Sequence, residues 1–275
     1  GKYGKIVLLY IGRDSVTLTL IFAAVSGAIT ALHLVGGLSL WWLLPTWLGY
    51  FISIALLYLI VVVFGLYFFL PKGDPSPRLR CFEQGIMKLT LRWVLVMLGM
   101  RVTVTGADKL PHTPYLLVGN HRPAFDPICT VAALESQVVF VAKPGVLNIP
   151  IIGSILERLC FLAIDRENPR NAVTTIKRAA QLVKDVNLCA GIYPEGTRSK
   201  DGSLLPLHAG SFKIAKLADC PVAVVTVRYE KNGLLPWNKR VYLTVVDVMD
   251  VDYVSASGTA PMAERAETAM RENLG

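Results

Sequence analysis

His121 and Asp126 stand in the string Gly-Asn-His-Arg-Pro-Ala-Phe-Asp, residues 119–126, and this spacing could support proton transfer. The string follows the apolar run 115–119, so we expect His121 at the carboxyl end of a strand, where sites of α/β proteins usually lie. A carboxylate bonded to one imidazole nitrogen leaves the other nitrogen as a general base. No enzyme nucleophile stands beside the pair, so the activated hydroxyl is expected to belong to a substrate. The alternative is structural: Asp126 before Pro127 caps a helix, and His121 is a turn residue.

A second polar string, Tyr-Pro-Glu-Gly-Thr-Arg-Ser, occupies residues 193–199 and also follows an apolar run. In it, Gly196 permits a sharp turn, and Thr197 can donate a hydrogen bond. Arg198 offers a planar fork that suits a phosphate group. A plainer interpretation is a surface turn with a solvated arginine.

Two further cations, Lys143 and Arg166, each follow an expected strand, 138–142 and 160–165 respectively. Together with the two strings, they place one His-Asp pair and three cations at four consecutive expected strand ends. The sequence lacks a G-x-S-x-G elbow, a phosphate-binding Walker loop and a zinc-binding helix motif. A self-contained serine hydrolase is therefore not expected.

The elements that must position these residues alternate between β-rich and helical runs after Met100, which predicts an α/β domain with a mostly parallel central sheet flanked by helices. The clearest intervening helix covers 169–187, with Asn168 as its cap and Pro169 at its first position. A further helix is expected after Pro261. The expected strands are 101–105, 115–119, 138–142, 160–165, 188–193, 222–229 and 240–248.

The segment before this domain is strongly apolar. From Val16 to Pro71, 56 residues include no Asp, Glu, Lys or Arg. Because about 20 helical residues cross a bilayer, we expect a transmembrane helical hairpin within residues 1–77, with spans at about 16–35 and 47–70 and a Pro-rich linker after them. Lys and Arg flank both ends and are missing from the turn, which predicts a multi-pass cell-membrane protein with its catalytic domain on the cytoplasmic side. The alternatives are a buried hairpin of a soluble protein and, less compatible with this length, a cleaved signal peptide.

A helix is expected over 78–100, because apolar residues recur there at spacings of three and four. Its polar stripe is mostly basic, as on an amphipathic helix that lies at a membrane surface. The alternative is an ordinary helix that docks on the domain. The stripe consists of Arg80, Gln84, Lys88 and Arg92.

Charge and cysteine content limit the partners. The net charge is +8, which suits anionic lipid or an acidic carrier protein. Nucleic acid is the weakest of the possible partners and is not expected, because no recognition motif accompanies the charge. The five cysteines show no metal-ligand spacing. We expect reduced core cysteines, no metal site and no cofactor.

The motifs together resemble those of the glycerolipid acyltransferase family with the His-x4-Asp motif, over about residues 80–250. The first block matches Asn-His-x4-Asp, the segment Phe-Leu-Ala-Ile-Asp-Arg at 161–166 resembles the second, and residues 193–199 resemble the third. Ala-Lys at 142–143 and Ile-Pro-Ile-Ile-Gly at 149–153 also look typical of the family. One departure is Val224, which stands where the family usually has a second proline after Pro221.

The resemblance implies an acyltransferase domain over 101–275, in which His121 is the general base and Asp126 its partner. It implies that Glu195, Gly196, Thr197 and Arg198 contribute to binding the acyl acceptor. It also implies that Lys143 and Arg166 lie near the phosphate of that acceptor.

The implied reaction moves an acyl group from acyl-CoA or acyl-carrier protein to the sn-2 hydroxyl of 1-acylglycerol-3-phosphate (lysophosphatidate), giving phosphatidate for phospholipid synthesis. Two alternatives stay open: another acceptor, either glycerol-3-phosphate or a different lysolipid, and a membrane lipid-binding protein without catalysis. The sequence decides neither the acyl donor nor its chain length.

Overall fold

A computed structural model describes residues 6–7, 13–37, 39–69, 77–123, 125–165, 168–197, 203–231 and 239–275 of the chain. Within them, strands and helices alternate after residue 100, as the sequence predicts. The strands form one eight-stranded sheet in the order β1-β2-β8-β7-β3-β6-β4-β5. Their bounds are β1 Ile6–Val7, β2 Arg101–Thr105, β3 Leu116–Gly119, β4 Val138–Ala142, β5 Leu162–Ala163, β6 Cys189–Ile192, β7 Val222–Lys231 and β8 Lys239–Met249.

The sheet is mostly parallel, which confirms the predicted fold class. Only the β1–β2 and β7–β8 pairs are antiparallel among the described strands. Helices follow the strands along the chain. They are α4 Asp126–Ala133, α5 Pro144–Leu147, α6 Ile152–Arg158, α7 Pro169–Val186, α8 Lys213–Ala218, α9 Val251–Ala256 and α10 Thr259–Leu274.

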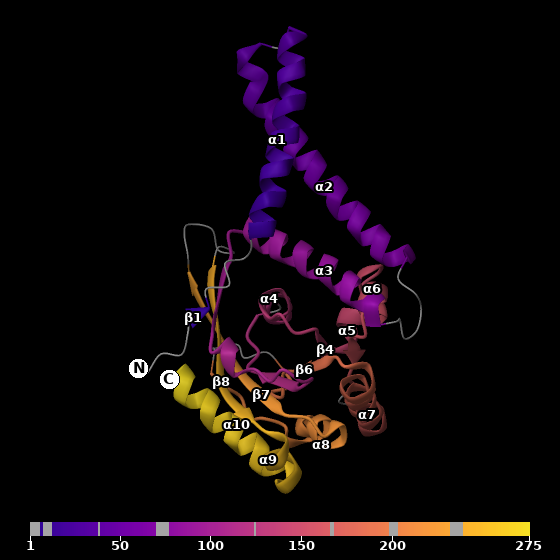
Figure 1. Ribbon diagram of the computed structural model, residues 1–275, viewed down its shortest axis with the longest axis vertical. Helices are drawn as coiled ribbons and strands as arrows, with labels where there is room; N and C mark the ends of the chain where they lie inside the picture. The colour runs from indigo at the N-terminus through magenta and orange to yellow at the C-terminus, as the bar shows by residue number, and fades with distance from the viewer. Residues whose placement is uncertain are drawn as a thin grey trace.

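Successive side chains of the central strands enter two separate hydrophobic cores, because a strand directs alternate residues to opposite faces. Leu117 and Val225 belong to the core beneath α4, whereas Leu116 and Val224 belong to the core that α7, α8 and α10 cover. Figure 1 shows this arrangement, with α4 on one side of the sheet and α8, α9 and α10 on the other. The sheet is therefore buried on both faces, as parallel sheets require.

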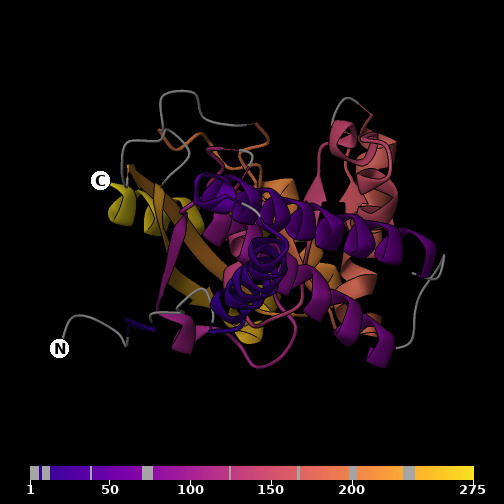
Figure 2. The ribbon, with the colours of Figure 1, turned by 90° about the horizontal axis from the view of Figure 1, so that it is seen from above.

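Two long apolar helices precede the domain, α1 (Arg13–Val35) and α2 (Leu43–Phe69), joined through a short 3-10 helix at Leu40–Trp42. Both are long and apolar enough to cross a membrane. Only 17% of the apolar window of α1 and 0% of that of α2 is buried within the protein, which disfavours the core hairpin of a soluble protein. Their exposed apolar surface indicates membrane association. They project away from the sheet in Figure 1 and cross over the domain in Figure 2.

The third helix, α3 (Pro77–Met97), joins the hairpin to the domain and matches the helix predicted over 78–100. Trp93 lies edge-to-face against Phe22 of α1 and Tyr58 of α2, with ring centroids 5.6 Å away in each case. The Tyr58 hydroxyl lies 3.0 Å from Thr90 Oγ1, at hydrogen-bond distance. These contacts hold the three helices together.

The described side chains of the polar stripe of α3 lie against protein. Lys88 Nζ donates to the backbone oxygens of Leu134, Glu135 and Ser136 at 2.7–3.0 Å. These carbonyls follow the carboxyl end of α4, where a cation is favourable. The side chain of Gln84 is buried, and Arg92 Nε donates to Ala132 O of α4 at 2.6 Å. The described part of the stripe therefore docks α3 on α4.

Candidate active site

His121 and Asp126 lie in contact at the carboxyl end of β3. His121 Nδ1 is 2.8 Å from Asp126 Oδ2. A carboxylate only accepts hydrogen bonds, so Nδ1 of the neutral imidazole carries the shared proton and Nε2 is the acceptor. The Asp126 side chain is fully buried, while 20% of the His121 side chain is exposed. A substrate hydroxyl can therefore reach the imidazole but not the carboxylate.

The predicted cap at Asp126 is wrong, although a helix does begin there. Phe125 occupies the N-cap position, Asp126 is the first helical residue, and neither makes a side-chain capping bond. The carboxylate turns back instead, and Oδ2 also accepts from the Arg122 N–H at 2.7 Å. Within this turn, Asp126 Oδ2 therefore bonds His121 Nδ1 and the Arg122 N–H, and it does not cap α4.

Tyr229 is a third member of this group that sequence reasoning missed. Its hydroxyl donates to Asp126 Oδ1 at 2.6 Å. Tyr229 lies near the end of β7, 103 residues further along the chain than Asp126. Sequence spacing carries no signal of this contact. One hint was available: a tyrosine at the carboxyl end of an expected strand lies at the same edge of the sheet as His121.

The imidazole of His121 stacks on the ring of Tyr193, with centroids 4.5 Å apart and planes 10° apart. Tyr193 in turn stacks on Phe140 of β4 at 5.1 Å. Gly191 makes room for this packing, because a Cβ at that position would lie 2.6 Å from the Phe140 ring. The stacked rings of Tyr193 and Phe140 fix the plane of the imidazole. The sequence did not suggest this role for Tyr193.

Asn120 anchors the backbone immediately before His121. Its side-chain amide donates to Val227 O at 3.1 Å and accepts from Val227 N–H at 2.7 Å. The side chain is 2% exposed, so these two bonds take the place of bonds to water. These bonds join Asn120, the residue after β3, to β7, and so fix the position of the backbone that leads into His121.

Glu195 is bonded to the backbone of His121. Glu195 Oε1 accepts from the His121 N–H at 2.6 Å, and Oε2 accepts from the Leu205 N–H at 2.9 Å. Burial raises the pKa of Glu195, and the two N–H bonds oppose that rise. Both carboxylate oxygens are therefore used inside the protein, so the structure gives Glu195 a positioning duty toward His121.

Of the remaining expected binding residues, the structure describes Gly196, Thr197 and Lys143. Gly196 and Thr197 are exposed, and Gly196 has the positive φ of 81° that its turn requires. Lys143 is exposed at the end of β4, which β6 separates from β3. No hydrogen bond or ion pair joins it to His121 among the described residues. Arg166 and Arg198 lie outside the described residues.

Among the described residues, none of the hydrogen bonds of His121 goes to a serine, threonine or cysteine side chain. Cys129 lies near the pair, with Sγ 3.9 Å from the Tyr229 hydroxyl, but burial raises the pKa of its thiol to about 12. It is therefore a protonated thiol at neutral pH rather than a nucleophile. The described part of the chain also holds no group of three or more His, Cys, Asp or Glu residues that could bind a metal ion.

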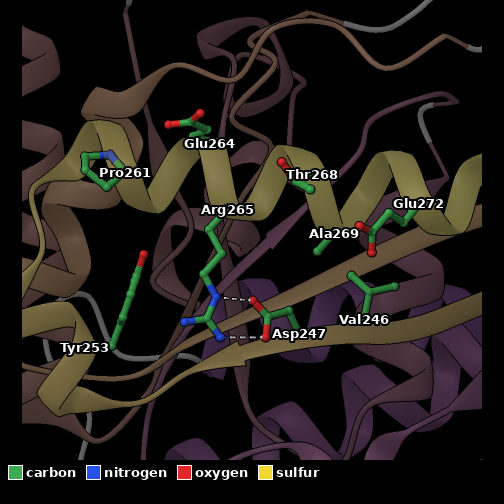
Figure 3. Close-up of a pocket in the computed structure, with 9 residues that line it drawn as sticks. All are labelled: Val246, Asp247, Tyr253, Pro261, Glu264, Arg265, Thr268, Ala269 and Glu272. Atoms are coloured by element: carbon green, nitrogen blue, oxygen red, sulfur yellow. Dashed lines mark hydrogen bonds and ion pairs between the residues drawn. The ribbon is translucent and has the colours of Figure 1, made fainter.

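A separate groove of about 530 Å³ lies between β8 and α10, against the core on the other side of the sheet. Arg265 crosses it and donates twice to Asp247, at 2.7 and 2.9 Å (Figure 3). The guanidinium also lies 4.5 Å from the ring centroid of Tyr253. The charged groups at the centre of the groove, Arg265 and Asp247, therefore bond each other and hold α10 on the sheet.

Comparison with known proteins finds similarity to acyltransferases. A model of the Acyltransferase family matches residues 101–229. The chain is 36% identical over 129 residues to the chloroplastic 1-acyl-sn-glycerol-3-phosphate acyltransferase BAT2 of Brassica napus, covering 46% of this chain and 37% of that protein. It is 26% identical over 172 residues to the 1-acyl-sn-glycerol-3-phosphate acyltransferase of Borreliella burgdorferi, covering 60% and 68%.

A human relative, 1-acyl-sn-glycerol-3-phosphate acyltransferase alpha, is 29% identical over 143 residues, covering 52% of this chain and 50% of that protein. The chain spans half the length or less of the plant and human relatives. The crystal structure of the 1-acyl-sn-glycerophosphate acyltransferase PlsC from Thermotoga maritima has the same fold, with a TM-score of 0.63, 20% identity and coverage of 82% of this chain and 91% of that one.

The segment matched by the family model begins at β2 and ends at Tyr229, so it contains His121, Asp126 and every described residue that contacts them. Through residues 101–229, the chain therefore resembles the Acyltransferase family.

Proposed function

We propose that this protein transfers an acyl group from an acyl thioester to the sn-2 hydroxyl of 1-acylglycerol-3-phosphate and so produces phosphatidate. The observation that carries the proposal is the buried Asp126 carboxylate, 2.8 Å from Nδ1 of a partly exposed His121. The names of the relatives support the choice of acceptor.

In the reaction, Nε2 of His121 takes the proton of the acceptor hydroxyl as its oxygen attacks the thioester carbonyl. Asp126 stabilises the imidazolium that forms. When the tetrahedral intermediate collapses, the carbon–sulfur bond breaks and the imidazolium returns the proton to the thiolate. The products are the new oxygen ester and a free thiol, and His121 is again neutral. A general base of this kind contributes roughly 10²–10⁴ in rate.

The acceptor's phosphate needs cations around the site. We assign this role to Lys143, exposed after β4, together with Arg166 and Arg198. Gly196 and Thr197 supply the exposed turn between Glu195 and Arg198.

The membrane supplies the acceptor in this proposal. Residues 1–77 anchor the chain through α1 and α2, and the segment 78–100, which contains most of α3, lies at the membrane surface and links the anchor to the domain at 101–275. Basic residues flank the apolar segment, which favours a catalytic domain on the cytoplasmic side. The acyl donor, acyl-CoA or acyl-carrier protein, would then approach from the cytoplasm.

An acceptor panel tests the proposal. Full-length protein in detergent micelles receives one acyl-CoA and, in separate reactions, lysophosphatidate, glycerol-3-phosphate or lysophosphatidylcholine, and thiol release is followed by colour reaction. We expect thiol release that depends on lysophosphatidate. Release with another acceptor alone would move the activity to the alternative substrates, and release with none of them would favour a lipid-binding protein.

A further inference from the structure

The Asp126 carboxylate has a donor that the reaction described above does not use. Tyr229 Oη donates to Oδ1 at 2.6 Å, while His121 Nδ1 and the Arg122 N–H both lie on Oδ2, at 2.8 and 2.7 Å. Of these three donors in the described part of the chain, two belong to the same short turn as Asp126. Tyr229 alone of the three comes from another element, the strand β7.

This arrangement restrains the carboxylate in a way that the turn cannot. A carboxylate bonded through Oδ2 only can still rotate about its Cβ–Cγ bond, because Oδ1 would be free to move. A donor on Oδ1 from a fixed strand stops that rotation and sets the direction of the bond from Oδ2 to His121. Positioned partners of this kind set the tautomer and orientation of a catalytic histidine.

Tyr229 is itself well fixed. The β7–β8 register pairs it with Val241, and Lys239 Nζ lies 5.7 Å from its ring centroid. Burial raises the pKa of the Tyr229 phenol, so the hydroxyl stays a donor throughout the range in which an enzyme is assayed.

We propose that Tyr229 is a positioning residue for acyl transfer, whose hydroxyl holds the Asp126 carboxylate in the orientation that presents Nε2 of His121 to the acceptor. This inference rests on the proposed function, because it concerns the efficiency of the same base.

The proposal has an electrostatic consequence that a purely structural contact lacks. A donor on Oδ1 draws negative charge away from Oδ2 and so weakens the stabilisation of the His121 imidazolium. Removing the hydroxyl should strengthen that stabilisation and move the acid limb of kcat/KM to higher pH. Among the described residues, other titratable groups next to this hydrogen-bonded series include Arg122, Glu195 and Tyr193 beside His121 and Asp126, and Cys129 and Lys239 beside Tyr229.

The test compares Tyr229→Phe with wild type in thiol-release kinetics across pH, on the full chain in detergent micelles with lysophosphatidate and acyl-CoA. We expect kcat to fall about 10- to 100-fold, as for loss of one hydrogen bond to a charged group, with little change in either KM. We also expect the acid limb to move upward. The matched control is Tyr242→Phe, whose hydroxyl donates to exposed Glu230 at 3.1 Å on the same strand pair, and it should behave as wild type.

Both variants are first compared with wild type by thermal unfolding, and kinetics are measured below the lower Tm, so that unfolding does not imitate a catalytic loss. A wild-type kcat in Tyr229→Phe would overturn the proposal, and so would a lower kcat with an unmoved acid limb, which indicates a packing role only. If wild type uses another acceptor from the panel, the same comparison is made with that acceptor. A wild-type protein that transfers to none of them overturns both the function and this inference.

Discussion

Glu195 offers the sharpest distinction between two roles for one residue. The family resemblance implies that it binds the acyl acceptor, whereas its contacts in the structure hold the backbone of His121. Glu195→Gln separates these roles, because it keeps the shape of the side chain and changes one oxygen into an NH₂ group.

The contacts set the size of the expected effect. Glu195 accepts two backbone N–H bonds, from His121 and Leu205, and glutamine can accept only one of them at its single oxygen. The lost bond to a charged group is worth about 1.5–3 kcal/mol. Part of that loss is offset, because burial raises the pKa of Glu195 and a neutral amide avoids the cost of a buried charge. We therefore expect a net loss of about 1–2 kcal/mol in the positioning of His121, or about 5- to 30-fold in kcat.

The assay is acceptor-dependent thiol release at varied lysophosphatidate. A positioning role predicts a lower kcat with an acceptor KM close to that of wild type. The control is Glu267→Gln, since Glu267 Oε2 also accepts from a backbone N–H near Leu205, that of Leu207 at 3.5 Å, but no hydrogen bond among the described residues joins Glu267 to His121. A raised acceptor KM with unchanged kcat in Glu195→Gln would refute the reasoning and return Glu195 to the acceptor site.

Three other predictions follow from the same structure. Asn120→Ala strands the buried N–H and C=O of Val227 and should lower Tm by about 5–10 °C in thermal unfolding, and a shift below about 1 °C would contradict the paired bonds. Burial, aided by Arg92, lowers the pKa of Lys88 from 10.5 to about 8. Between these pH values the unfolded chain therefore binds more protons than the folded protein. The stability of wild type relative to Lys88→Met should rise as pH increases from about 8 to 10.5. A difference in Tm that is constant with pH would contradict this shift. Arg198→Ala should raise the KM for lysophosphatidate more than that for acyl-CoA, and an unchanged lysophosphatidate KM would remove Arg198 from the phosphate site.

Local patterns predicted the elements well where one signal dominated. The strands at 101–105 and 138–142 appear with those bounds, because β-rich apolar runs there have clear ends. Asn168 caps α7 as expected, accepting from the N–H groups of Arg170 and Asn171. The strand expected at 160–165 is only Leu162–Ala163, because Cys160 takes a positive φ of 68° and Phe161 N–H bonds back to Leu156 O to close α6.

The site was predictable only along one segment of chain. His121 and Asp126 lie five residues apart, so their spacing carried the signal. Tyr229 reaches them through the β3–β7 pairing, and Asn120 bonds a residue 107 positions away. Such partners depend on strand order, which the sequence pattern leaves open. The polar stripe of α3 illustrates the same limit, since a basic stripe suits lipid headgroups and backbone carbonyls equally well. Only the fold brings the carbonyls that follow α4 to Lys88.

The central claim is that His121 is the base that activates the acceptor hydroxyl, and His121→Ala tests it most directly. The variant should unfold near the wild-type temperature, because the backbone bonds of Asn120 and Glu195 do not involve the imidazole. Lysophosphatidate-dependent thiol release at saturating acyl-CoA should fall by roughly 10²–10⁴. A folded His121→Ala protein that releases thiol at close to the wild-type rate would contradict the account.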